Sequence, residues 1–254
     1  FMIVGTPSGV TLAPEGGAHQ SVGTPLIGMS QDGLASFEPA FADELAVIIE
    51  WAFDYLQRDG ASEPDARTWL RDATGGSVYL RLTTNPIEQP GARADEAFRQ
   101  GVINGGYWLR RPGPNCDLVI AYQGSVAPEA IHAAGILGER CRDVGVLAVT
   151  SADRLNAGWS AAQVARASGH RDAQSHADRL LGGLPAHCQI VTVIDGHPAT
   201  LAWIGGIAGH RILPLGVEHF GQTGTIGDLY RSCSIDTDGI VARVRSEVLG
   251  RGTW

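Results

Sequence analysis

The stretch DLVIAYQGSVAPEAIHAAGILGERCRDVGVLAVTS, residues 117–151, predicts the fold class of this chain. Residues 117–124 and 145–151 are short apolar runs bounded by turn residues, which is typical of buried strands. The amphipathic segment 127–145 between them has the length and spacing of a helix. A strand, a helix and a second strand in this order form a parallel pair, because the helix carries the chain back to the edge where the first strand began.

The same alternation continues to the end of the chain, with apolar strand-like runs at 188–196 and 210–217 and helical patterns at 197–210 and 238–250. Repeated strands and helices of this length predict an α/β fold, with a mostly parallel sheet covered by helices on both faces. Such sheets bind ligands at the carboxyl ends of their strands. We therefore look for a site near residues 151, 196 and 221.

The first third of the chain is less regular. Residues 1–5 predict a short buried strand, and a long glycine-rich polar segment follows to about residue 36. Apolar residues at helical spacing predict a helix over 38–58, and residues 77–84 predict a further strand. The interval that follows holds four prolines before residue 115, which favours a linker. The predicted parts are a first domain over 1–85, a linker over 86–114 and a second domain over 115–254.

Composition excludes several classes of function. The 254 residues carry a formal net charge of -8, which disfavours binding to nucleic acid. No apolar run approaches the roughly 20 residues of a membrane span. The four cysteines are scattered, without a C-x-x-C pair, and favour buried thiols in a reducing, cytoplasmic setting. No phosphate-binding loop, nucleophile elbow or zinc motif is present, so no metal ligands are expected, and the polar stretch around His170 and His176 is expected to be solvated.

The loop APEGGAHQS, residues 13–21, is the strongest candidate for chemistry from the residues alone. Its two glycines permit close backbone approach or positive φ angles. Glu15 can hydrogen-bond His19 or bias it electrostatically, and an imidazole changes charge near neutral pH, as proton transfer requires. The alternative is a surface-loop histidine with no task.

Two further turns follow predicted strands. Asp195 and His197 could position a ligand at the sheet edge, but a turn at the start of a helix, with Pro198 in its first position, is the favoured interpretation. Glu218 and His219 lie in a glycine-punctuated loop, where a structural contact and a binding role are equally compatible with the sequence. The roles of these four residues stay open at this stage.

Several segments together resemble a known family. They are TLAPEGGAHQS (11–21), SFEPAFADEL (36–45), VYLRLTT (78–84), LAVTSADRLNAGW (147–159), VIDGHPATLAWIGG (193–206) and PLGVEHFGQTG (214–224). In this order they resemble the carboxyl-terminal half of transketolase-like, thiamine-diphosphate-dependent enzymes, and most of all the homodimeric type of the pyruvate dehydrogenase first component. The resemblance runs from about residue 5 to residue 240.

This resemblance implies that residues 1–85 are the carboxyl-terminal part of a pyrimidine-binding domain and that 115–254 are a transketolase carboxyl-terminal domain. It implies that Glu15 and His19 are catalytic and that His19 and Gln20 contact the substrate. The cofactor would be thiamine diphosphate with Mg²⁺, whose thiazolium carbanion attacks a 2-oxo acid such as pyruvate before carbon–carbon cleavage.

The chain also departs from the family pattern. It has no Gly-Asp-Gly motif for the metal and diphosphate, and the 14 residues before Glu15 leave no room for the glutamate that activates the cofactor. The resemblance therefore implies an incomplete site that needs the missing pyrophosphate-binding domain or a partner chain, and no cofactor-binding residue or metal ligand is assigned here. A fragment and a natural separate subunit are both compatible with this pattern, and the isolated chain is expected to be inactive.

The family also implies a dimer and association with the acyltransferase core of a 2-oxoacid dehydrogenase complex. Two alternatives remain. The chain could belong to a transketolase that moves two-carbon units between sugar phosphates, for which Arg81 is the candidate phosphate contact. It could instead be a non-catalytic module for dimerisation or regulation.

Overall fold

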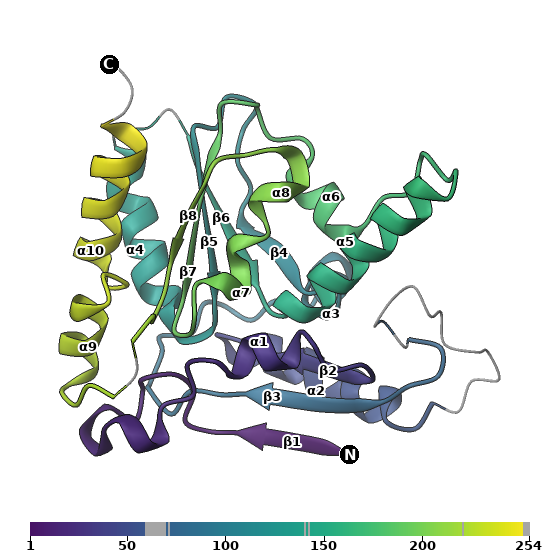
Figure 1. Cartoon of the computed structure of the whole chain (residues 1–254), viewed down its shortest axis with the longest axis horizontal. Coiled ribbons are helices and arrows are strands. Elements are labelled where there is room, and N and C mark those ends of the chain that lie inside the picture. Colours follow the sequence, from purple (N-terminus) through teal and green to yellow (C-terminus); the bar gives the residue numbers. More distant parts are fainter. Residues whose placement is uncertain (59–69, 71, 140, 142, 220, 251–254) are drawn as a thin grey trace.

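The computed structural model describes residues 1–250 except 59–69, 71, 140, 142 and 220, and the chain forms two sheets (Figure 1). The smaller sheet has the order β1-β3-β2, and both pairs are parallel. Its strands are β1 (Met2–Gly5), β2 (Leu34–Phe37) and β3 (Ser77–Arg81). The central strand β3 is therefore covered along both edges, whereas β1 leaves one edge unpaired within the described sheet.

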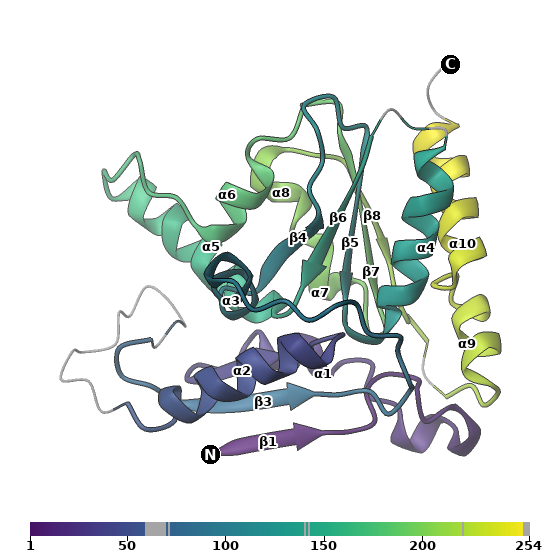
Figure 2. The ribbon, with the colours of Figure 1, turned by 180° about the vertical axis from the view of Figure 1, so that it is seen from behind.

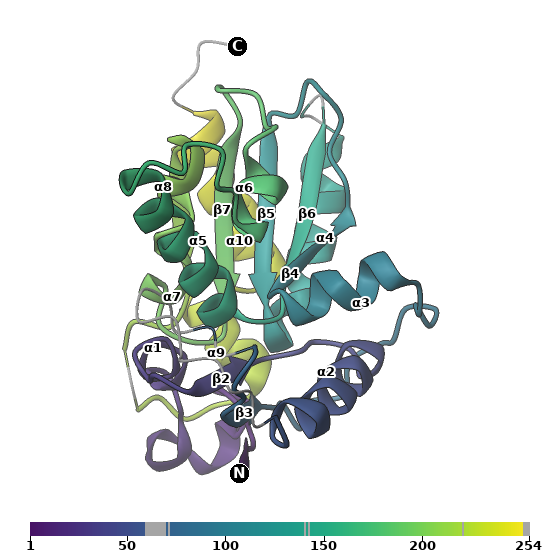
Figure 3. The ribbon, with the colours of Figure 1, turned by 90° about the vertical axis from the view of Figure 1, so that its right-hand side faces the viewer.

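Helix α2 (Ala42–Tyr55) packs its apolar face on the smaller sheet, and the short helix α1 (Thr24–Gly28) lies apart from it beside β2 (Figure 3). The helix begins where the buried Glu44 carboxylate accepts hydrogen bonds from the backbone N–H groups of Ala40 and Phe41, which lack partners within the helix. Trp51 meets Phe37 of β2 edge-on, with the ring centroids 5.3 Å apart. Aromatic packing thus fixes the helix on the sheet.

The larger sheet has the order β4-β6-β5-β7-β8, and all of its pairs are parallel except β4 with β6. Its strands are β4 (Gly106–Arg110), β5 (Leu118–Gln123), β6 (Val144–Val149), β7 (Gln189–Ile194) and β8 (Ile212–Leu215). The predicted α/β class with a mostly parallel sheet is confirmed.

Helices cover both faces of the larger sheet (Figure 3). On one face lie α4 (Ala127–Gly138), α10 (Thr237–Arg243) and a π-helical segment, Val244–Leu249. On the other lie α5 (Ala152–Ala167), α6 (His176–Leu181), α7 (Ala199–Ala202) and α8 (Gly205–Ala208). Along β5, the side chains of Leu118 and Ile120 pack in the core on the α4 and α10 side of the sheet. Those of Val119 and Ala121 pack in the core on the α5 to α8 side. Burial on both faces explains why this strand is a continuous apolar run.

The strands predicted at 1–5, 77–84, 117–124, 145–151, 188–196 and 210–217 correspond to β1, β3 and β5 to β8. The helices predicted at 38–58 and 127–145 correspond to α2 and α4, although positions 140 and 142 lie outside the described residues. The segment 197–210 forms α7 and α8 instead of one helix, and the closing segment forms α10 and its π-helical continuation.

The polar segment before residue 36, for which no element was predicted, contains α1 and β2. One expectation was wrong. The predicted linker 86–114 contains α3 (Glu96–Ile103) and β4, so much of it is packed structure. Asp95 starts α3 by accepting a hydrogen bond from the N–H of Phe98, at 2.9 Å. The flanking prolines and glycines hid both elements, because each is too short to show a clear period. The division into domains stays a prediction.

Strand β2 joins the two sheets. The N–H of Glu38, just after β2, donates to the carbonyl oxygen of Thr150, just after β6, at 2.8 Å. The hydroxyl of Ser151 donates to the carbonyl oxygen of Ser36 at 2.6 Å. The carboxyl ends of the larger sheet's parallel strands therefore face the smaller sheet (Figure 2). The site lies at this junction.

Candidate active site

A loop over residues 6–23 lies at the junction, and hydrogen bonds join its beginning to its end. The N–H of Ser21 donates to the carbonyl oxygen of Gly9 at 3.3 Å, and the N–H of Gly9 donates to the hydroxyl of Ser21 at 3.0 Å. The N–H of His197, in the turn after β7, donates to the carbonyl oxygen of Val22 at 3.0 Å. The end of the loop is thus attached to the larger sheet.

The loop that follows β8 provides a second support, through Gln20. The side-chain amide of Gln20 donates to the carbonyl oxygen of Gln222 at 2.8 Å, and its oxygen accepts from the N–H of Gly221 at 3.0 Å. Both the nitrogen and the oxygen of the amide are hydrogen-bonded, so Gln20 holds the loop over residues 6–23 against the loop after β8. The substrate contact predicted for Gln20 would have to replace these hydrogen bonds.

The two glycines of the E-G-G-A-H run are required by packing against the same loop. A Cβ atom at Gly16 would lie 2.3 Å from the hydroxyl oxygen of Thr223, and Gly16 has a φ of +75°. A Cβ atom at Gly17 would lie 2.4 Å from the Cα atom of Gly221. Neither distance is compatible with a side chain at these positions. Close approach of two backbones therefore explains Gly17, and the positive φ together with the Thr223 side chain explains Gly16.

Glu15 and His19 lie together on the outer side of this loop. Each is the last residue of a 3-10 turn, Ala13–Glu15 and Gly17–His19. The His19 Nε2 atom lies 3.7 Å from the Glu15 Oε2 atom, and the side chains are 56% and 62% exposed. The two side chains lie close together, and the ring stays accessible to a group arriving from outside. An accessible imidazole beside a carboxylate is a candidate proton-transfer pair.

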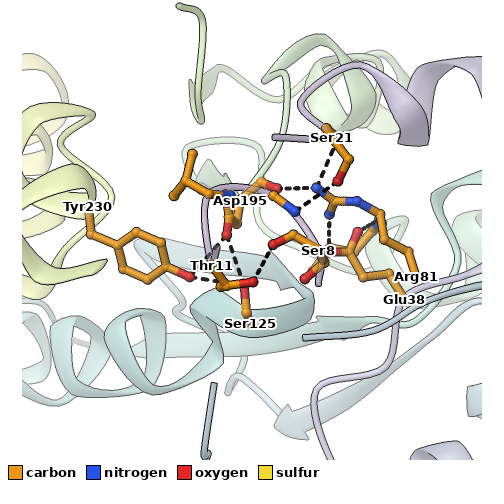
Figure 4. A network of polar contacts seen from close by, with 11 residues as sticks. Ser8, Thr11, Ser21, Glu38, Arg81, Ser125, Asp195 and Tyr230 are labelled. Atoms are coloured by element: carbon orange, nitrogen blue, oxygen red, sulfur yellow. Dashed lines mark hydrogen bonds and ion pairs between the residues drawn. The ribbon is translucent and has the colours of Figure 1, made fainter. Parts of the chain in front are cut away.

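Directly behind the loop, Asp195 is fully buried at the end of β7 (Figure 4). Its Oδ1 atom accepts from the N–H of Val10 at 3.0 Å. Its Oδ2 atom accepts from the hydroxyls of Ser125 (3.3 Å) and Tyr230 (3.2 Å), the latter on helix α9 (Ile226–Ser232). A Cβ atom at Gly9 would lie 2.2 Å from the carboxyl carbon of Asp195, so this glycine makes room for the carboxylate. Asp195 thus connects three separate segments to the larger sheet.

Arg81, at the end of β3, is the cation of the same network. Its guanidinium forms an ion pair with Glu38 and donates to the carbonyl oxygens of Asp195 (2.7 Å) and Ser21 (3.1 Å). The Gln123 amide donates to the second oxygen of Glu38 at 2.9 Å. The Arg81 and Glu38 side chains are 1% and 3% exposed. One arginine therefore joins both sheets and the loop.

Burial changes the protonation of the acids at this junction. Desolvation raises the pKa of both Glu38 and Asp195, against the opposing charge of Arg81. Desolvation also raises the pKa of Asp153, at the start of α5, to about 7, although its carboxylate accepts from the N–H of Ser36 at 3.0 Å. Glu38 is held by donors on both sheets, Asp195 by donors in the loop, after β5 and on α9, and Asp153 links α5 to β2.

The other predicted positions have different outcomes. Asp195, whose role the sequence left open, is buried and connects the loop to the larger sheet. His197 accepts at Nδ1 from the N–H of Ala199 (3.2 Å), which agrees with the favoured turn at the start of a helix. Glu218 and His219 are exposed. The expectation of a solvated stretch was wrong for His176, whose Nε2 lies 2.7 Å from the carbonyl oxygen of Gly106 and whose pKa is lowered by burial.

Sequence reasoning missed the ion pair between Glu38 and Arg81. A signal was present in each segment, since SFEPAF and VYLRLTT each place one charged residue among apolar neighbours. A charge inside an apolar strand is rarely buried without a partner. Two such residues of opposite sign favour a buried ion pair, although no local pattern in the sequence shows that they are in contact.

Within the described ranges, no group of three or more His, Cys, Asp or Glu side chains is arranged to hold a metal ion. No helix in this part of the chain is both long and apolar enough to cross a membrane. The chemistry visible at the junction is therefore that of the Glu15–His19 pair on a supported loop.

Comparison with solved structures defines the class of fold. The chain superposes on a transketolase from Leishmania mexicana with a TM-score of 0.66 over 96% of its length, at 19% identity. A transketolase variant from Pichia stipitis gives 0.67 over 98%, also at 19% identity. These matches cover 29% and 30% of the transketolase chains. The chain therefore has the fold of part of a transketolase.

Sequence comparison gives a further relative. The chain is 27% identical over 250 residues to the pyruvate dehydrogenase E1 component of Mycolicibacterium smegmatis, and it spans a quarter of that protein's length. The resemblance inferred from the sequence motifs is confirmed. No family model matches the chain. A further structure, a split-gene transketolase described as an inactive beta4 tetramer, matches with a TM-score of 0.59 at 18% identity, over 67% of its chain.

Proposed function

We propose that this chain is part of the decarboxylating component of a thiamine-diphosphate-dependent 2-oxoacid dehydrogenase, and that it acts on pyruvate. Support comes from the similarity to a pyruvate dehydrogenase E1 component over 96% of this chain. Because the chain spans a quarter of that relative, we assign only some of the active-site residues to it. The other active-site residues belong to a pyrophosphate-binding domain or a partner chain.

The observation that carries the proposal is the exposed Glu15–His19 pair on a loop held from two sides. An exposed imidazole with no fixed position would be a poor proton-transfer group, since catalysis depends on orientation. Here Gln20 and the packed glycines fix the backbone while the ring faces outward. His19 moves a proton to or from the substrate, and Glu15 lies beside the imidazole as its nearest acid.

The residues of this chain do not fit the metal-bound diphosphate of the cofactor. Mg²⁺ is held in proteins by carboxylates together with phosphate oxygens and water. The described residues offer no suitable ligand cluster, and Glu15, the acid beside His19, is engaged with the imidazole. When bound, thiamine diphosphate supplies the electron sink for carbon–carbon cleavage. We assign its anchoring to the partner and derive no step through it.

The surroundings of Arg81 favour pyruvate over a sugar phosphate. Arg81 was the candidate contact for a phosphate group, but it is buried, and its guanidinium is engaged by Glu38 and two backbone carbonyls. A phosphate could bind it only by separating a buried ion pair, which is costly. Arg81 is therefore not accessible as the phosphate contact that the transketolase alternative requires.

The smaller sheet offers a surface for the partner. Ile3 and Val4 on the edge strand β1 are about half exposed. Exposed apolar residues on an unpaired edge strand are typical of an interface. We propose that the missing domain or partner chain covers this edge, and that the assembly is a dimer that docks on the acyltransferase core of a dehydrogenase complex. A role in dimerisation or regulation alone would use the same edge without requiring the exposed Glu15–His19 pair.

The substrate is tested with the assembly purified through a tag on this chain. With pyruvate, thiamine diphosphate, Mg²⁺ and an artificial electron acceptor, we expect reduction of the acceptor and release of carbon dioxide. A parallel assay with a ketose phosphate donor and an aldose phosphate acceptor should give no transfer. Transfer without pyruvate turnover would replace the proposal with the transketolase alternative.

The shared site is tested by calorimetric titration of the isolated chain with thiamine diphosphate and Mg²⁺. We expect no tight binding, because the diphosphate ligands lie outside this chain. Micromolar or tighter binding by the chain alone would contradict a shared site. An active assembly that contains no second polypeptide or further domain would contradict it as well.

A further inference from the structure

Two thiols lie together at the amino-terminal ends of the parallel strands of the larger sheet, opposite the candidate active site. Cys116 comes two residues before β5 and Cys188 one residue before β7, and these are neighbouring parallel strands. Their sulfur atoms are 3.7 Å apart, although the residues are 72 positions apart in sequence. A disulfide has a sulfur–sulfur distance of about 2.05 Å, so a small approach of the two side chains would complete one.

Both thiols are buried but lie just inside the protein surface. Their side chains belong to the core between the sheet and helices α5 to α8. The residues immediately before them, Asn115 and His187, are exposed. The two thiols thus lie next to exposed residues, at the amino ends of β5 and β7 and away from the junction of the two sheets.

The two sulfurs also have complementary roles. The thiol of Cys188 donates toward the sulfur of Cys116, and the thiol of Cys116 donates to the carbonyl oxygen of Leu118 at 3.1 Å. The contact between the sulfurs lowers the pKa of Cys116 and raises that of Cys188. We therefore assign the attack on the oxidant to Cys116.

We propose that Cys116 and Cys188 form an oxidative modification site that small hydroperoxides convert into a reversible disulfide. The Cys116 thiolate attacks the peroxide O–O bond, taking one oxygen to become a sulfenic acid while the other oxygen leaves as water or an alcohol. The Cys188 sulfur then attacks the Cys116 sulfur and displaces water. Two thiols and one hydroperoxide give one disulfide and either two waters or one water and one alcohol. The proposal is independent of the function assigned above.

The test exposes the folded wild-type chain to hydrogen peroxide, blocks the remaining thiols with an alkylating agent and maps the peptides by mass spectrometry. We expect two of the four thiols to be lost, with a cross-linked peptide pair that contains Cys116 and Cys188. A thiol reductant should reverse the change. The cross-link closes a long loop, so the oxidised protein should unfold about 5 °C higher than the reduced protein.

Matched variants separate this site from general oxidation. In Cys188→Ser, Cys116 should be trapped as a sulfenic acid by a dione reagent, and no cross-link should form. Cys233→Ser, which changes the half-buried thiol on the other side of the sheet, should oxidise like the wild type. Circular dichroism establishes that each variant is folded, and Cys188→Ala replaces the serine variant if that one is not.

Cys141 is the internal competitor, since it is also buried and lies close enough to Cys116 for their charges to interact. A dominant link between Cys116 and Cys141, which Cys141→Ser would remove, overturns the proposal. Loss of all four thiols at one common rate overturns it too, because that result would mean oxidation through global unfolding.

Discussion

Glu15 and Glu38 lie at one junction, and each carboxylate has a single side-chain cation or potential cation as its partner. The Glu15–His19 pair is more than half exposed, whereas the Glu38–Arg81 pair is almost fully buried. Exposed pairs are screened by water and contribute little to stability, but other molecules can reach them. Buried pairs are out of reach, and removing one partner leaves an uncompensated charge. Burial, more than residue type, assigns chemistry to the first pair and architecture to the second.

The largest expected effect comes from removing the buried cation. Arg81→Met leaves the carboxylate of Glu38 and the backbone carbonyls of Ser21 and Asp195 without their donor. We expect the free energy of unfolding to fall by about 3–5 kcal/mol, as for other broken buried ion pairs. Equilibrium unfolding in urea measures the loss.

The control for this change is Arg231→Met, since Arg231 pairs with Asp228 at the surface, and we expect little change in stability. Adding Glu38→Leu to Arg81→Met should recover part of the loss, because the buried charge is removed together with its partner. A loss below about 1 kcal/mol for Arg81→Met alone would show that the network is not what joins the sheets.

Removing the exposed imidazole should lower turnover and leave stability unchanged. We expect His19→Ala to lower the turnover of the purified assembly by about 100-fold, the usual contribution of a proton-transfer group. The unfolding temperature should stay the same, since His19 is exposed. His170→Ala, at an exposed histidine in the loop after α5, serves as the control and should keep full turnover. Unchanged turnover in His19→Ala would remove His19 from the mechanism.

The third prediction concerns the pH dependence of stability. The pKa of Asp153 is raised to about 7 in the folded protein, so the folded state binds more protons than the unfolded state between about pH 4 and pH 7. Stability therefore falls as the pH rises through this window. Asp153→Asn keeps an acceptor for the N–H of Ser36 but does not titrate.

We expect Asp153→Asn to flatten the decline and to be more stable than the wild type at pH 8, by about 2 kcal/mol. Urea unfolding at intervals from pH 4 to pH 8 measures both curves. Some decline should remain, since the raised pKa values of Glu38, Glu44 and Asp195 act in the same direction. Parallel curves for the two proteins would show that Asp153 does not titrate in this window.

The smallest effect is expected at the exposed acid. Glu15→Gln removes the charge 3.7 Å from the His19 imidazole and should change the free energy of unfolding by less than about 0.5 kcal/mol. Turnover should fall only a few-fold, and the difference from the wild type should shrink at high salt. Steady-state assays at two ionic strengths measure it. A loss as large as that in His19→Ala would mean that Glu15 takes part in the reaction directly and is more than a neighbour of His19.

The parallel core could be predicted because strands such as β5 are buried on both faces and so appear as unbroken apolar runs. The Glu15–His19 pair could be found for a related reason, since its members are four residues apart and local spacing brings them together. By contrast, β4 was hidden because it is a short edge strand between prolines and glycines. The role of Asp195 depends on Val10, 185 positions away, and no local pattern reports such a contact.

The attachment of Gln20 to the loop after β8 also fixes when the site can form. Gln20 binds residues 201 and 202 positions later in the chain. At ribosomal rates of about 5–20 residues per second, the E-G-G-A-H run waits roughly 10–40 s during synthesis before its support exists. Closing contacts over such separations is also slow in refolding from denaturant. The segment that carries His19 therefore reaches its supported geometry only after residues 221 and 222 have been made.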